Sequence, residues 1–188
     1  FETPGSTPHN MVRILSEITS KHAEAFQKIC SMKRLSIFID GSGDVEVTQC
    51  DIVVPFKGNE VEFHTLGLSF DLLNELETLG LIKFDSTGGF VALNVPEKGI
   101  ITYINGVTQE VESHKKDKLP IGNVMLTEAG ECLSKIIQPI PTPNYISLEK
   151  KYMISNGVVF KETPGYIIID DGLGGLSLHK ISEPSVEQ

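Results

Sequence analysis

Histidine side chains are the ones that most often bind metals or act as general bases near neutral pH. The chain has five of them: His9, His22, His64, His114 and His179. No two stand in an HxH or HExxH arrangement, the spacings that bring two imidazoles to one metal ion. His22-Ala23-Glu24 resembles the HxE of zinc deaminases, but no PCxxC follows it. The histidines therefore predict neither a metal site nor a hydrolytic centre.

The three cysteines, Cys30, Cys50 and Cys132, are an odd number and lie far apart without a CxxC pair. A disulfide framework or a zinc ribbon needs an even, clustered set, so neither is expected. Cys30 lies on the apolar side of a helical pattern, where a buried free thiol is the ordinary outcome. It stands about two helical turns from His22, so the two cannot act as nucleophile and base. We expect no enzyme, no cofactor and a reducing, cytoplasmic setting.

Two glycine-rich segments lack the features of a phosphate-binding loop. Gly41-Ser42-Gly43 has no GxxxxGK[ST] lysine and leads into a strand-like run. Gly172-Leu173-Gly174-Gly175 is followed by no helix whose N-terminus could hold a phosphate. A nucleotide site is therefore not expected.

The chain is acidic. Its 16 Lys and Arg residues face 25 Asp and Glu residues, which gives a formal net charge of −9. Domains that hold nucleic acid are usually basic, and only Arg13 and Arg34 offer a guanidinium fork for phosphate. Hydrophobic residues make up 40% of the 188 residues, enough for a folded core. No run approaches the roughly 18 apolar residues of a membrane helix, so no membrane partner is expected.

Residues 1–34 are expected to form an N-terminal helical pair. Apolar residues recur at helical spacing over 11–18. Thr19 or Ser20 can cap a second helix over 21–33. Its expected apolar face consists of Ala23, Phe26, Ile29 and Cys30.

The segment 35–138 is expected to form the core of the fold. A strand at 35–39, a turn at 40–44 and a short apolar run at 51–56 come first. The clearest element is a helix within 66–80, capped by Ser69 and stopped by a left-handed Gly80. Its apolar face consists of Leu72, Leu73, Leu76 and Leu79.

Strands and turns dominate the rest of that segment. Strands are expected at 81–84 and 90–95, with Gly88-Gly89 turning the chain back between them. Asn105-Gly106, between β-rich runs at 100–104 and 107–111, predicts a hairpin with a type I′ turn. A strand at 121–126 leads to Thr127, which can cap a helix over 128–137. The apolar set of that helix is Ala129, Cys132, Leu133, Ile136 and Ile137.

The segment 139–171 is expected to form a C-terminal helix and short strands. A proline-rich stretch at 139–143 breaks the preceding helix, and Asn144 can cap a helix over 145–155. Strand-like runs follow at 158–160 and 166–169. Residues 172–188, rich first in glycine and then in polar residues, are expected to be a loose tail.

The order of these elements resembles a winged helix. The phrases Leu-Glu-Thr-Leu-Gly-Leu-Ile at 76–82 and Leu-Thr-Glu-Ala-Gly at 126–130 carry the resemblance. It implies an α+β fold in which a helical layer packs on a small antiparallel sheet and the hairpin at 100–111 projects as a β-hairpin wing.

The first third of the chain carries a second resemblance. Pro4-Gly5-Ser6, then Arg13-Ile14-Leu15, then Ala23, Phe26 and Cys30 are similar to a bacterial and phage-encoded family catalogued as domain of unknown function 2806. In that family a PGS phrase precedes a helix with RTL..L..L and then A..F..LC. Its members carry further helical sequence upstream, which implies that this chain is the C-terminal part of a longer protein. The family brings no established activity.

A winged helix suggests DNA binding, but the expected recognition helix disfavours it. That helix carries Asp71, Asn74, Glu75 and Glu77 on its polar side and no Lys or Arg, so it would repel phosphates. We therefore expect a non-enzymatic protein-interaction or regulatory module whose partner contacts these four residues. The alternative is a DNA-binding winged-helix transcriptional regulator that uses the wing and a basic loop. Its contacts would be Lys98, Lys115, Lys116 and Lys118.

Self-association is a further hypothesis. The runs at 158–160 and 166–169 are rich in β-branched residues, and exposed strand edges pair readily with copies of themselves. A homodimer through the C-terminal strands is the expected form.

Overall fold

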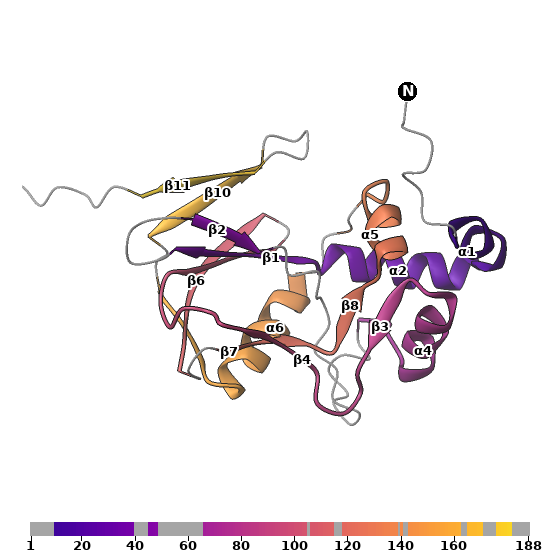
Figure 1. Cartoon of the computed structure of the whole chain (residues 1–188), viewed down its shortest axis with the longest axis horizontal. Coiled ribbons are helices and arrows are strands. Elements are labelled where there is room, and N and C mark those ends of the chain that lie inside the picture. Colours follow the sequence, from indigo (N-terminus) through magenta and orange to yellow (C-terminus); the bar gives the residue numbers. More distant parts are fainter. Residues whose placement is uncertain are drawn as a thin grey trace, which may run out of the picture.

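Helices gather at one end of the molecule and antiparallel strands at the other, which gives an α+β fold (Figure 1). The structure is a computed structural model that describes residues 10–39, 45–48, 66–104, 106–114, 118–138, 140, 143–162, 165–170 and 176–181. The expected turn at 40–44 and apolar run at 51–56 lie outside these residues, as do Lys115 and Lys116.

The helical end consists of α1 (Met11–Glu17), α2 (Ser20–Ser31), α4 (Phe70–Leu79) and α5 (Glu128–Ser134). Thr19 caps α2, as its sequence predicts. The buried face of α2 differs from the expected one, because Ala25 is buried while Ala23 is exposed. On α1, Met11 and Ile14 are buried.

The expected caps of α4 are confirmed. The Ser69 side chain accepts a hydrogen bond from Leu72 N at 3.2 Å, and Gly80 ends the helix in the left-handed conformation with φ 86°. The four leucines of the expected apolar face, Leu72, Leu73, Leu76 and Leu79, are all buried. Because caps and helical spacing are local, the sequence determines this element almost completely.

Two short ribbons connect the helical end to the main sheet. β3 (Ile82–Phe84) pairs with β8 (Val124–Leu126), and β4 (Phe90–Leu93) pairs with β7 (Lys118–Gly122). The expectation that the strands at 81–84 and 90–95 run back on each other is therefore wrong. The expected strand at 121–126 is divided at Asn123, whose side chain donates to Asp85 O at 2.6 Å and so ties the break between β7 and β8 to the residue after β3.

The main sheet has five strands in the order β2-β1-β5-β6-β9. These are β2 (Val45–Thr48), β1 (Arg34–Ile39), β5 (Ile100–Ile104), β6 (Val107–Ser113) and β9 (Val158–Phe160). The expected hairpin is confirmed as β5–β6, with Ile104 opposite Val107 and Gly106 at φ 89°. It does not project as a free wing, because β1 pairs with β5 and β9 pairs with β6.

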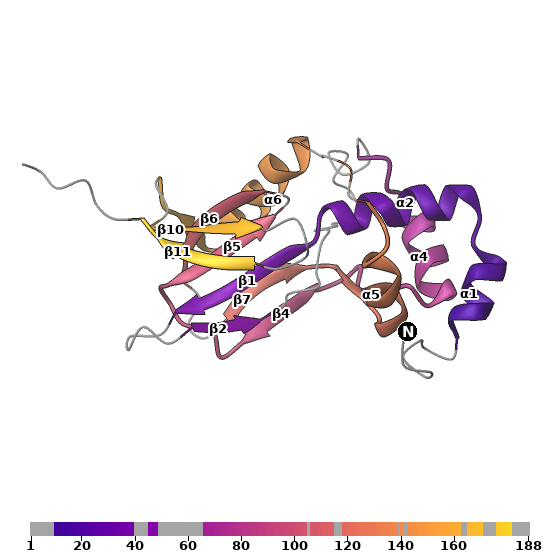
Figure 2. The same cartoon turned by 90° about the horizontal axis from the view of Figure 1, so that it is seen from above.

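Each face of this sheet is covered by a later part of the chain. The ribbon of β10 (Tyr166–Asp170) and β11 (Leu176–Lys180) lies over one face and α6 (Pro143–Ser155) over the other (Figure 2). Alternation along β1 explains this, because Leu35 and Ile37 share a core cluster with Ile168 of β10, while Phe38 shares one with Met153 of α6.

Three C-terminal expectations need correction. Residues 176–180 form β11, so the tail expected over 172–188 contains a strand, which is held by its five-residue register with β10. Helix α6 begins at Pro143, a residue suited to the first helical turn, and not after Asn144. Helix α5 ends at Ser134, which leaves Ile136 of the expected apolar set exposed.

The largest core cluster joins residues from Met11 in α1 to Tyr145 in α6. It therefore crosses the boundaries expected at residues 34 and 138, and the division into four segments remains a prediction. In the part of the chain that the structure describes, no helix is long and apolar enough to cross a membrane.

Candidate functional site

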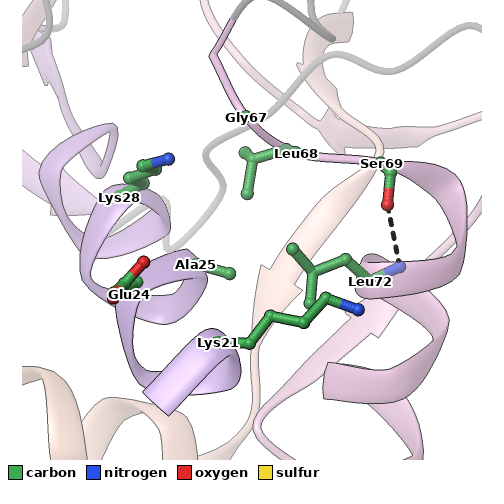
Figure 3. A pocket seen from close by; sticks show the side chains of 8 residues that line it. All are labelled: Lys21, Glu24, Ala25, Lys28, Gly67, Leu68, Ser69 and Leu72. Carbon is green, nitrogen blue, oxygen red and sulfur yellow. Dashed lines mark hydrogen bonds between the residues drawn. The ribbon is translucent and has the colours of Figure 1, made fainter.

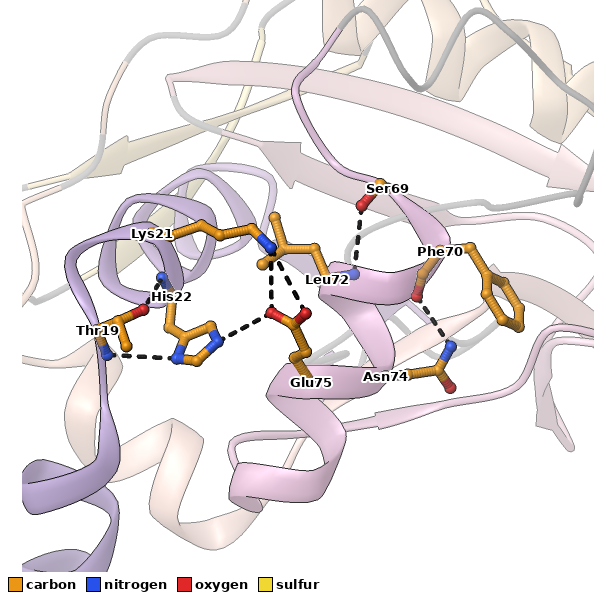
Figure 4. Close-up of polar contacts among 8 residues, drawn as sticks. All are labelled: Thr19, Lys21, His22, Ser69, Phe70, Leu72, Asn74 and Glu75. Carbon is orange, nitrogen blue, oxygen red and sulfur yellow. Dashed lines mark hydrogen bonds and ion pairs between the residues drawn. The ribbon is translucent and has the colours of Figure 1, made fainter.

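Glu75, on the acidic side of α4, contacts α2 (Figure 4). Its carboxylate accepts a hydrogen bond from His22 Nε2 at 3.0 Å and forms an ion pair with Lys21 Nζ at 3.2 Å. These bonds hold the pKa of Glu75 below its ordinary value, with the His22 bond the larger cause. Glu75 thus joins two helices of the same chain.

His22 holds a structural position at the start of α2. Thr19 Oγ1 accepts from His22 N, and His22 Nδ1 accepts from Thr19 N, both at 3.3 Å, so that His22 completes a capping box. Because Nδ1 accepts from the backbone, Nε2 is the nitrogen that donates to Glu75. The sequence signal for this role is the Thr19-x-x-His22 spacing, in which histidine replaces the usual Glu or Gln.

The other three residues on the acidic side of α4 differ in their hydrogen bonds. Glu77 Oε1 accepts from Phe84 N at 2.8 Å and links α4 to β3. Asn74 donates to Phe70 O one turn earlier, at 2.9 Å. Asp71 is exposed and has no hydrogen bond or ion pair to any described residue. Of the four residues expected to contact a partner, Asp71 is the one whose side chain forms no hydrogen bond or ion pair within the described chain.

The basic residues of the alternative hypothesis are only partly described. Lys98 precedes β5 and Lys118 begins β7, and both are exposed. Lys115 and Lys116 lie outside the described residues.

A pocket of about 320 Å³ opens beside the Glu75 contact, between α2 and the start of α4 (Figure 3). We call it the α2–α4 pocket. Its polar lining comes from Lys21, Glu24, Lys28 and Ser69, and its apolar lining comes from Ala25, Leu68 and Leu72, with Gly67 at one side. Sequence analysis missed it because its two walls are far apart in the chain.

The β10–β11 ribbon presents a second surface, which includes part of the strand-like run expected at 166–169. Ile167 lies opposite His179, and Ile169 lies opposite Ser177, with all four side chains exposed. Ile181, two residues beyond His179, is exposed as well. We call the surface formed by Ile167, Ile169, Ser177, His179 and Ile181 the outer face. Alternation at 167–169 and 177–181 is the sequence signal for it.

Ser177 and His179 on this face lie 3.0 Å apart, from Oγ to Nε2. A serine nucleophile needs a base that is itself oriented by a third group. No described residue provides that third contact to His179, and both side chains are exposed on a strand. The pair is a surface hydrogen bond between neighbours on one strand face.

The remaining reactive groups are buried or scattered. Burial raises the pKa of the Cys30 thiol to about 12, so it carries no thiolate near neutral pH. Within the described ranges, no three His, Cys, Asp or Glu side chains are placed to hold a metal ion.

A buried ion pair joins α6 to β1 of the main sheet. Arg34 Nη1 donates to Glu149 Oε1 at 2.7 Å, and the two side chains are only 3% and 5% exposed. Arg34 also donates to Pro120 O of β7 at 3.3 Å. Burial raises the pKa of Glu149 above its ordinary value, and the guanidinium of Arg34 opposes that rise. Burial likewise raises the pKa of Tyr145, one turn away on α6.

Comparisons with known proteins give no match: no family model, no curated protein and no solved structure is similar to this chain. The resemblance of the first third to the family of unknown function therefore remains a prediction.

Proposed function

We propose that this chain is a non-enzymatic protein-interaction or regulatory module that associates through the outer face of the β10–β11 ribbon. The observation that carries the proposal is the exposure of Ile167, Ile169 and Ile181, at 39%, 46% and 39%, on one face of a two-stranded ribbon. Clustered large apolar side chains on a surface mark sites of association.

The rest of the fold supports this use because it fixes the ribbon in place. Ile168, on the opposite face of β10, packs into the core with Leu35 and Ile37. Ile168 N donates to Thr108 Oγ1 of β6 at 3.1 Å. Glu110 of β6 accepts from Gly165 N at 2.7 Å and pairs with Lys161, which anchors the segment before β10. A rigid support presents the outer face without an ordering cost.

A second copy of this chain is the partner that fits best. None of the five outer-face residues is Asp, Glu, Lys or Arg. Two molecules that each carry a formal charge of −9 repel each other, and a face without acidic groups is where they approach at the lowest cost. This proposal keeps the homodimer through C-terminal strands but assigns the contact to a face of β10–β11.

Sedimentation velocity over a range of concentrations tests the proposal. We expect a concentration-dependent dimer that is lost in the double variant Ile167→Thr/Ile169→Thr, because threonine keeps strand propensity but removes apolar area. The matched control is Val12→Thr/Leu15→Thr on α1, whose side chains are 79% and 55% exposed. A monomer at every concentration, or equal loss in both variants, contradicts the proposal.

For the helical end we propose a winged-helix-like arrangement. Its support is the path α4–β3–β8–α5, in which β3 and β8 pair next to two capped helices. Under this proposal residues 85–123 are an enlarged wing whose β5–β6 hairpin has joined the main sheet. The acidic Asp71 would still contact a partner. The charge reversal Asp71→Lys tests this contact without breaking a bond within the described chain. Reversal of Glu75 or Glu77 would also break hydrogen bonds within the chain.

The DNA-binding regulator remains the second candidate, and the exposed Lys98 and Lys118 favour it. Titration of labelled duplex DNA across a salt series tests it. Binding that falls steeply with salt and is abolished by changing Lys115, Lys116 and Lys118 to Glu would establish this function. Absence of binding at low salt would exclude it for this chain.

We also propose a reducing, cytoplasmic setting for the chain. Its support is that Cys30 and Cys132 are both free thiols.

A further inference from the structure

His179 is the histidine on the outer face of β10–β11. It lies opposite Ile167 in the register of the two strands, and its ring Nε2 lies 3.0 Å from Ser177 Oγ. Ile181 is its exposed neighbour two residues further along the chain. None of the five outer-face residues is Asp, Glu, Lys or Arg, so no group of this face can neutralise a charge on the imidazole.

The charged residues of the ribbon occupy the alternate positions of its strands. Lys180 follows His179 on β11 and lies opposite Tyr166 in the register. Asp170 ends β10 opposite Leu176. These positions belong to the other face of the ribbon, the one that packs against β1. The outer-face side chains are all exposed, so no described element buries His179.

Association through this face would place two copies of His179 in one interface, because a two-fold dimer uses the same surface of both molecules. A neutral imidazole can enter such an interface with its contact to Ser177. A protonated imidazole carries a charge, and removing an unpaired charge from water is strongly unfavourable. The serine hydroxyl can accept a hydrogen bond from the charged ring but cannot neutralise it. Protonation therefore opposes association.

We propose that protonation of His179 dissociates the dimer, so that the outer face associates at pH 8 and separates near pH 5.5. This inference rests on the proposed self-association through the same face. Histidine is the side chain that ordinarily changes its charge in this range. At pH 5.5 the protonated form of a free histidine outnumbers the neutral form about tenfold. Two rings per dimer therefore raise the dissociation constant about 100-fold between pH 8 and pH 5.5.

Sedimentation velocity at pH 8 and pH 5.5 tests this switch in the parent chain and two variants. His179→Gln keeps a polar side chain beside Ser177 but takes up no proton. Its dissociation constant should stay constant or fall at pH 5.5, because protonation of the other histidines lowers the net negative charge of each copy. His114→Gln removes an exposed histidine that lies after β6 and outside the ribbon, and it should keep the rise of about 100-fold. Amide spectra at pH 5.5 verify that each chain is folded.

Failure of the switch and failure of the dimer give different results. A parent dimer whose dissociation constant does not rise at pH 5.5, or rises equally in His179→Gln, overturns the role of His179 and leaves self-association standing. A parent chain that is monomeric at pH 8 at every concentration overturns both proposals. His179→Thr, a strand-forming residue, is the second neutral variant if His179→Gln is monomeric at pH 8. Loss of the dimer at pH 8 in both variants also overturns the switch, because it requires only that the side chain be uncharged.

Discussion

Single side chains on α4 show why a surface pattern does not by itself reveal a partner. Asp71, Glu75 and Glu77 all lie on the polar side that helical spacing predicts. Two of them are used inside the molecule, Glu75 by α2 and Glu77 by β3. The spacing could predict that these side chains avoid the core of α4. It could not predict that a second helix would present His22 to one of them.

Replacing His22 should affect both the cap of α2 and Glu75. In His22→Ala, Thr19 N loses its acceptor, so we expect the free energy of unfolding to fall by about 1 kcal/mol. The pKa of Glu75 should rise toward its ordinary value of 4.5, measured by NMR titration of the side-chain carboxyl.

The lowered pKa of Glu75 in the folded chain determines how the stability of the fold depends on pH. Its carboxylate stabilises the fold above the unfolded pKa, and this contribution is lost as pH falls through the folded pKa. The His22→Ala variant should lose less stability over that acid range than the parent. His114→Ala, an exposed histidine, is the control. An unchanged Glu75 midpoint in His22→Ala would contradict the assigned contact.

The buried ion pair of Arg34 and Glu149 should contribute strongly to stability. Glu149→Ala leaves the guanidinium of Arg34 without its carboxylate, and we expect a loss of about 3–5 kcal/mol in urea unfolding. The double variant Arg34→Met/Glu149→Leu should recover most of that loss, because it removes both charges. The exposed Glu97→Ala should change stability by less than about 0.5 kcal/mol. A loss below about 1 kcal/mol in Glu149→Ala would show that the pair contributes little to the free energy of unfolding.

The two segments that resemble a winged helix, 76–82 and 126–130, are hydrogen-bonded to each other. Thr127 caps α5 by accepting from Gly130 N at 3.1 Å, and its hydroxyl donates to Gly80 O at 2.6 Å. Thr127 N donates to Leu81 O at 3.1 Å. The end of α4 is thereby fixed to the start of α5. The glycine at 130 is required because a Cβ there would lie 2.1 Å from Leu81 O.

Gly130→Ala should therefore be destabilising for steric reasons. We expect a loss of about 1–3 kcal/mol in the free energy of unfolding, because backbone must move away from the new methyl group. Gly88→Ala is the matched control, since its Cβ would meet only Asp85 Oδ2 at 3.8 Å, an ordinary contact. It should change stability by less than about 0.5 kcal/mol. Similar losses in the two variants would contradict the close approach of α5 to Leu81.

Elements with local signals could be predicted, and pairings between distant segments could not. Ser69 and Gly80 mark the ends of α4, and Asn105-Gly106 marks the β5–β6 hairpin. Nothing near Ile82 indicates that its strand pairs with Leu126 and not with the next strand along the chain. Such pairing is decided by how the whole chain packs.

At the scale of the whole molecule, α6 and the β10–β11 ribbon enclose the main sheet from opposite sides (Figures 1 and 2). The alternation of Leu35, Ile37 and Phe38 shows that both faces of β1 are apolar, but it cannot name what covers them. The α2–α4 pocket and the outer face likewise arise only when distant segments meet. The pocket could not be predicted from composition or motifs, and of the outer face only the strand-like run at 166–169 was predicted, whereas α+β character and the absence of a metal motif could be read directly.

We propose that two copies of this chain meet through the outer face of β10–β11. The most direct test is an isotope-filtered NOE experiment on a mixture of labelled and unlabelled protein, which detects contacts only between molecules. We predict intermolecular NOEs from the methyl groups of Ile167, Ile169 and Ile181. Their absence at high concentration, or intermolecular NOEs that instead involve Val12 and Leu15 of α1, would contradict the account.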